Sequence, residues 1–234
     1  MDLKGEFVKI YTAWLLCFVM GLALLVLTGV IFPLFPQEMA IPNGLDSPVI
    51  AFEFARTHAD LVAVFGHIDD PLRAERILAM NQGNQVDMAY MVVYSSFIAL
   101  FFYAAYLKNR QVIWLVFVAT ALLAGVADAV ENSILFDITD NLELASGLNL
   151  LPYPVHIKFL ALFVCAFGVG MFLKDSRKSS VRIFGYTLQG LSPLAVILTL
   201  VGLVSAATIV ITLAWLTQLI IAYGEYRREK RAAA

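Results

Sequence analysis

The sequence predicts an all-α, polytopic helical membrane bundle with a small exported helical cap, and three observations support this fold class. Of the 234 residues, 61% are hydrophobic and 15% are charged, whereas soluble domains average roughly 45–50% apolar and 25% charged residues. The mean hydropathy of the chain is +0.81. Long uncharged stretches alternate with short charged segments, which is the pattern of several membrane-spanning helices.

The overall charge argues against a nucleic-acid partner, and the positions of the two cysteines argue against a disulfide or a metal site. The formal net charge is −2, so we expect no nucleic-acid partner. Cys17 and Cys165 lie in separate apolar segments without a CxxC pair, and we interpret them as small buried hydrophobic residues.

The N-terminal unit, residues 1–32, is predicted to be one transmembrane helix. Tyr11 to Phe32 carry no charge, and at about 1.5 Å per residue they can cross a hydrocarbon core of about 30 Å. Phe32-Pro33-Leu34-Phe35-Pro36 follows in place of a small-residue cleavage site. We therefore expect a retained helix rather than a removed signal peptide.

Residues 33–85 are predicted to form an exported amphipathic helical insert, because acidic residues outnumber arginines in this stretch. Ser47-Pro48 and Asp70-Pro71 each place Pro after a residue that can cap a helix, and Thr57 is a third N-cap. These signals predict three short helices on the membrane surface. Asn81-Gln-Gly-Asn84 is expected to break the chain before it enters the membrane again.

Residues 86–173 are predicted to form a three-helix transmembrane core. A basic turn at 108–111 and an acidic loop at 137–154 divide this stretch into spans. The positive-inside rule makes the turn cytoplasmic and the loop exported, so the N-terminus is expected in the cytoplasm. The spans expected here are residues 86–107, 112–135 and 155–173.

Residues 174–234 are predicted to form a C-terminal transmembrane hairpin and a basic cytoplasmic tail. Ile183 to Gly224 carry no charge and are followed by a cluster of basic residues at 227–231. A cytoplasmic tail requires two helices that turn near Gly202 to Ser205, which gives six spans. In the alternative, Ser192-Pro193 begins one long tilted helix, which gives five spans and an exported basic tail.

The candidate site begins with three polar residues in the 112–135 span. Asp128, Glu131 and Asn132 are three and four residues apart, so a helix places them on one face. Ionisable residues in membrane spans usually face the bundle interior, pair with other groups and mark functional sites.

Other ionisable residues are expected at the same depth on the exported side. Asp87 falls in the first turn of its span, with Tyr90 and Tyr94 on the same face, and His156 and Lys158 open the 155–173 span. We expect these groups to form one layer with the Asp128 face.

Two further groups of residues are interpreted relative to this layer. Glu53 and Arg56 of the insert are candidates for a lid over it. We interpret Trp215, Thr208 and Thr212 as a helix-packing face.

Several functions fit such a layer. Lys158 among carboxylates is either a structural ion-pair network or part of a pocket for a small amphiphile or a membrane lipid. We favour such binding, or a structural or accessory role beside other membrane-protein subunits, over catalysis, because no hydrolase or transferase motif is present. We expect no cofactor. In the alternative, Asp87, Asp128, Glu131 and His156 bind a divalent metal in a membrane-embedded enzyme.

The motif Asp128-x-x-Glu131-Asn132, the insert motif Phe52-Glu53-Phe54-Ala55-Arg56 and Asp87 at the start of the second span resemble a group of uncharacterised bacterial multi-pass inner-membrane proteins. The resemblance covers residues 10 to 173. It implies location in a bacterial inner membrane and implies no activity.

Overall fold

The computed structural model describes residues 3–41, 45 and 47–232, and this part of the chain contains helices and no strand. Six of its helices are long and apolar enough to cross a membrane, which confirms the predicted polytopic bundle and its six spans. They are α1 (Leu3–Ile31), α4 (Arg73–Asn109), α5 (Ile113–Asp140), α6 (Pro152–Lys174), α7 (Ser179–Leu200) and α8 (Val204–Ala232).

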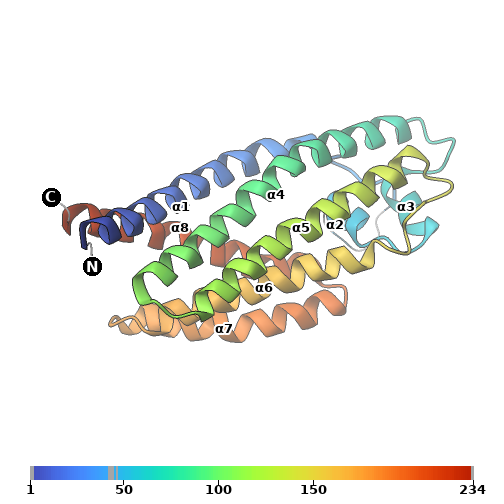
Figure 1. The fold of residues 1–234 in the computed structure, drawn as a ribbon. Helices are drawn as coiled ribbons and strands as arrows, with labels where there is room; N and C mark the ends of the chain where they lie inside the picture. Colours follow the sequence, from blue (N-terminus) through green and yellow to red (C-terminus); the bar gives the residue numbers. More distant parts are fainter. Residues whose placement is uncertain (1–2, 42–44, 46, 233–234) are drawn as a thin grey trace.

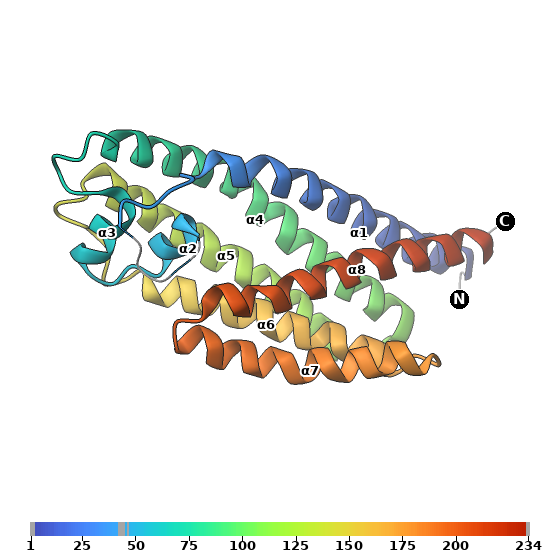
Figure 2. The same cartoon turned by 180° about the vertical axis from the view of Figure 1, so that it is seen from behind.

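The six long helices run side by side in one elongated bundle, with both termini at one end (Figures 1 and 2). A short 3-10 helix, η1 (Phe32–Leu34), follows α1, and two short helices, α2 (Pro48–Glu53) and α3 (His58–Phe65), cover the opposite end. We call this the cap end. Each of α4, α5, α6 and α7 packs on its neighbours in the sequence, and α8 closes the ring by packing on α1.

The two short cap helices begin where the sequence predicts. Ser47 precedes Pro48 at the start of α2. Thr57 and Asp60 form a reciprocal capping box at the start of α3, in which the Asp60 carboxylate accepts from Thr57 N at 2.8 Å. Gly66 ends α3 at φ 94°, a conformation that favours glycine.

The third predicted short helix is not separate, and the predicted break at residues 81–84 is wrong. Those residues lie inside α4, which begins at Arg73 and continues without a break past Asp87, several turns farther along the helix. Gly83 is a packing site: the Phe35 ring occupies the space that a Cβ at Gly83 would need. The polar stretch at residues 81–84 therefore continues the helix, and Gly83 within it leaves room for the Phe35 ring.

The predicted C-terminal hairpin is confirmed. α7 ends at Leu200 and α8 begins at Val204, and the turn between them contains Gly202 at φ 84°. Pro193 lies inside α7 rather than at the start of a helix, so the five-span alternative is wrong.

Close helix contacts hold the bundle together where glycines face each other. A Cβ at Gly185 of α7 would lie 2.9 Å from the Gly170 carbonyl oxygen of α6, and one at Gly170 would lie 2.7 Å from the Gly185 carbonyl oxygen. Small residues at such crossings let membrane helices approach closely. Cys17 and Cys165 are buried and unpaired, as the sequence predicts.

Gly185→Ala should destabilise the protein, because the new methyl group meets backbone atoms that cannot rotate away. We expect a loss of about 1–3 kcal/mol, typical of overpacking. Gly190→Ala in the same helix is the matched control, since no atom lies within 4 Å of the place that its new methyl group would take; it should be neutral or more stable by up to about 1 kcal/mol. Thermal unfolding in detergent measures both, and equal effects would contradict the crossing geometry.

The distribution of basic residues predicts the orientation of the bundle. The α4–α5 and α6–α7 turns, which carry Lys108, Arg110, Arg177 and Lys178, lie at the same end as the two termini (Figure 1). We therefore expect that end to face the cytoplasm. The test is cysteine labelling of the full chain with a membrane-impermeant maleimide.

Glu38→Cys at the cap end should label in intact cells, whereas Lys230→Cys should label only after permeabilisation. Both positions are exposed, and the two native cysteines are at most 2% exposed and give little background. The reverse labelling pattern would invert the orientation.

Candidate functional site

A buried lysine of α6 lies at the centre of a group of carboxylates near the cap end. Lys158 Nζ is 2.7 Å from Glu131 Oε1, 3.2 Å from Glu53 Oε1 and 3.3 Å from Asp128 Oδ1. The side chains of Lys158, Asp128 and Glu131 are more than nine-tenths buried, and the Glu53 side chain is 11% exposed. One ammonium group therefore ties α2, α5 and α6 together.

The local sequence explains how these carboxylates converge. The buried positions of α5 recur every three or four residues, so Asp128 and Glu131 face inward together. Glu53 is the last residue of α2. The Phe52 ring meets the Phe65 ring of α3 edge to face, with ring centroids 4.9 Å apart, and this contact fixes α2 above the bundle.

A second row of polar contacts joins α4 to α5. Asn132 Nδ2 donates to Asp87 Oδ2 at 2.7 Å, and the Tyr94 hydroxyl donates to Asp128 Oδ2 at 2.8 Å. The helices come close because Gly125 of α5 packs on Ser95, whose Oγ would be 2.8 Å from a Cβ at position 125. Asp87 is thus connected to the lysine cluster through α5, the helix that carries both Asn132 and Asp128.

The cluster holds more carboxyl groups than ammonium groups. Four carboxylates, Glu53, Asp87, Asp128 and Glu131, accompany the single ammonium of Lys158, and the Oε2 atoms of Glu53 and Glu131 have no hydrogen-bond partner among the described residues. Burial raises the pKa of Glu53 above its usual range, and Lys158 offsets this only in part. The site therefore favours additional positive charge or protons.

A cavity of about 390 Å³ borders this cluster. Glu53, Asp87, Asp128 and Lys158 form its polar wall, and residues of α1, η1, α2, α4, α6 and α8 form the rest. The remaining lining residues are mostly aliphatic or aromatic: Ile31, Phe32, Phe35, Ser47, Val49, Ile50, Tyr90, Tyr94, Phe159, Leu162, Ser205, Thr208, Ile211, Thr212 and Trp215.

Three aromatic rings face this cavity as a group. Tyr94 stacks on Trp215 with ring centroids 5.5 Å apart, and Tyr90 contacts both, with centroids 5.9 Å from Tyr94 and 6.3 Å from Trp215. Tyr90 and Tyr94 are predicted site residues, whereas the sequence pattern assigned Trp215 to helix packing alone. A signal for the site was present, because Trp215 shares a face with Thr208 and Thr212 on an otherwise apolar stretch of helix, and all three residues line the cavity.

Four predicted site residues do not line this cavity: Glu131, Asn132, His156 and Arg56. His156 Nδ1 is 2.5 Å from the Pro152 carbonyl oxygen of its own helix, and its ring packs against Phe54. Arg56 donates to the carbonyl oxygens of Glu53 and Ala55 at 3.2 and 2.7 Å. Arg56 therefore supports the end of α2, and its role as a lid stays a prediction.

The alternative metal site stays a prediction. No group of three or more His, Cys, Asp or Glu side chains among them is arranged to hold a metal ion. The ammonium of Lys158 lies between the carboxylates of Asp128 and Glu131, so these two acids already share a counter-charge.

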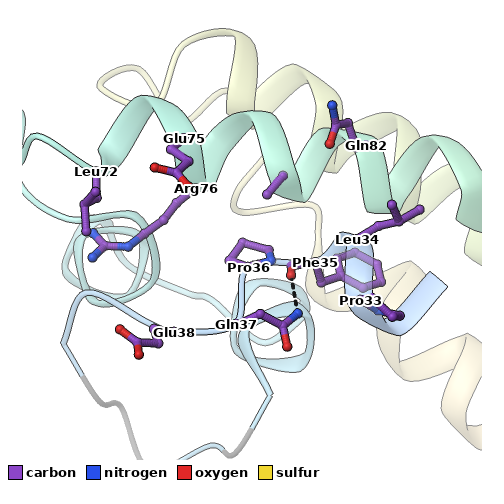
Figure 3. A pocket seen from close by; sticks show the side chains of 11 residues that line it. Pro33, Leu34, Phe35, Pro36, Gln37, Glu38, Leu72, Glu75, Arg76 and Gln82 are labelled. Carbon is purple, nitrogen blue, oxygen red and sulfur yellow. Dashed lines mark hydrogen bonds between the residues drawn. The ribbon is translucent and has the colours of Figure 1, made fainter. Parts of the chain in front are cut away.

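A second cavity of about 430 Å³ lies on the outer side of Phe35, between residues 33–38 and the first turns of α4 (Figure 3). Its polar side chains are spread around it instead of converging on one point. Arg76, its cation, is already bound to Asp70 at 2.9 Å. The cavity beside Lys158, which we call the inner cavity, is therefore the stronger candidate for a binding site.

Comparison with known proteins adds no family and no fold relative. No protein-family model, no curated protein and no solved structure matches the chain. The candidate site is consequently defined by the geometry of the inner cavity and its carboxylates.

Lys158→Met should destabilise the protein strongly, because it leaves buried carboxylates without a counter-charge; losing one partner of a buried ion pair costs about 3–5 kcal/mol. Glu53→Gln should change stability by less than about 1 kcal/mol, since Asp128 and Glu131 still neutralise Lys158 and one buried charge is removed. Thermal unfolding in detergent at neutral pH compares the two variants. A larger loss in Glu53→Gln than in Lys158→Met would contradict a surplus of negative charge.

Proposed function

We propose that this integral membrane protein binds a small amphiphile or lipid in the inner cavity. The observation that carries the proposal is the composition of that cavity, which has buried carboxylates and Lys158 at one wall and aliphatic and aromatic side chains elsewhere. Pockets for small molecules combine apolar walls with a few converging polar groups in this way. Such a ligand has a polar head and an apolar body.

The position of the cavity supports entry from the side of the bundle. Phe32, the first residue of η1, is 60% exposed, and Thr212 of α8 is exposed as well, yet both line the cavity. The edge between α1 and α8 is therefore where the cavity meets the surroundings of the spans. A molecule dissolved in the membrane can reach the carboxylates there without crossing water.

An ion-pair network without a ligand accounts for less of the structure. It explains why Lys158 contacts three carboxylates, but it leaves the adjacent cavity unused. It also leaves Asp87 with a hydrogen bond from Asn132 and no salt-bridge partner among the described residues. A carboxylate beside an apolar cavity is costly without a counter-charge, so a ligand that pairs with Asp87 is the more complete account.

Lipid that remains bound during purification tests this function. We expect mass spectrometry of the detergent-purified protein to find a retained amphiphile in the wild type and at least a five-fold loss in Thr212→Phe, whose ring fills the cavity edge. Thr187→Phe is the matched control, because Thr187 is also an exposed threonine on a long helix with its hydroxyl bonded to the carbonyl four residues earlier. Equal retention in all three proteins would contradict the proposal.

A further inference from the structure

We infer that the ligand is a single-chain amphiphile with an organic ammonium headgroup, held with its head beside Asp87 and Glu53 and its chain in a smaller cavity between α1 and α8. This inference rests on the binding function proposed above and adds the chemistry of the ligand. Three features carry it: the continuity of two cavities, the surplus of carboxylates and the aromatic faces between them.

The inner cavity continues into a smaller one of about 150 Å³, farther from the cap. The two share Phe32, Tyr90, Thr212 and Trp215 as lining residues. No charged side chain among the described residues lines the smaller cavity, and the Tyr90 hydroxyl there is already bonded to Thr28 at 3.3 Å. An apolar cavity of about this volume holds a hydrocarbon of the size of benzene, so it accommodates a short length of alkyl chain.

The charges of the inner cavity select the sign of the headgroup. Lys158 is already shared by Glu53, Asp128 and Glu131 and has little attraction left for an anion. Two carboxylates are less than fully paired: Asp87 has its single bond from Asn132, and Glu53 is 8% exposed and keeps Oε2 without a partner among the described residues. A cation compensates these groups, whereas an anion adds a repulsive charge in a poorly solvated site.

The aromatic rings select an organic cation. Tyr90, Tyr94 and Trp215 lie within 6.3 Å of one another, centroid to centroid, and line the same cavity as the incompletely paired carboxylates. Ring faces attract ammonium groups within about 6 Å, and tryptophan does so most strongly. The cavity volume of about 390 Å³ also far exceeds the space of a bare ion, since a water molecule takes only about 30 Å³.

Two probes with the same chain and opposite headgroup charge test the inference: 11-bromoundecyl-trimethylammonium and 11-bromoundecanoate. Bromine quenches tryptophan fluorescence at short range. Trp215 lines both cavities, whereas Trp14 and Trp114 are at most 3% exposed and line neither. We expect the full-length protein in a neutral detergent to show saturable quenching by the ammonium probe, lost in Trp215→Phe, at a concentration at least ten-fold below that of the carboxylate probe.

Variants locate the two ends of the probe. Asp87→Asn should raise the half-saturating concentration of the ammonium probe about ten-fold, and Glu53→Gln serves the same purpose if Asp87→Asn does not fold. Glu143→Gln, which removes a half-exposed carboxylate bound to Arg73 outside the cavity, should leave it unchanged. The short-chain 4-bromobutyl-trimethylammonium should bind at least ten-fold more weakly, because it cannot fill the smaller cavity.

The outcomes separate the two proposals. Saturable quenching that depends on Trp215 but is equal for both probes, or stronger for the carboxylate, overturns the ammonium headgroup and leaves amphiphile binding intact. Undiminished binding of the short-chain probe overturns the placement of the chain. If neither probe gives saturable, Trp215-dependent quenching, the binding function itself is wrong.

Discussion

The contact on which the cap end depends is the ammonium group of Lys158 held among three carboxylates. It joins a short helix outside the spans to two helices of the bundle, through atoms 2.7 to 3.3 Å apart. Removing charges from water is costly, and their mutual attraction repays this cost only in favourable geometry. The cluster therefore ties α2, α5 and α6 to one another through a single ammonium group.

The surplus of carboxylates connects the fold to function. Neutralising Lys158 needs one carboxylate, yet three contact it and Asp87 lies beside them. A purely structural pair would not need this excess, and each additional buried acid costs stability unless it is protonated or paired. The cavity beside the excess acids, with the rings of Tyr94 and Trp215 in its wall, provides the place for a positive partner.

Helical periodicity and charge bias were sufficient to predict the spans and much of the site. The face that carries Asp128, Glu131 and Asn132 is buried, because a three- and four-residue spacing on a helix leaves little choice. The break near Gly83 was wrong, because what fills the space above a glycine is a tertiary property, here the Phe35 ring. Trp215 was missed for a related reason: a sequence does not show that α8 returns to lie beside α4.

The placement of Glu53 on a separate short helix has a consequence for biogenesis. Glu53 is synthesised before α4, α5 and α6, yet its carboxylate reaches its counter-charge on α6. The cluster therefore cannot form before α6 is inserted, and until then Glu53 lacks its contact with Lys158. A chain interrupted before α6 therefore carries Glu53, Asp128 and Glu131 without the counter-charge of Lys158.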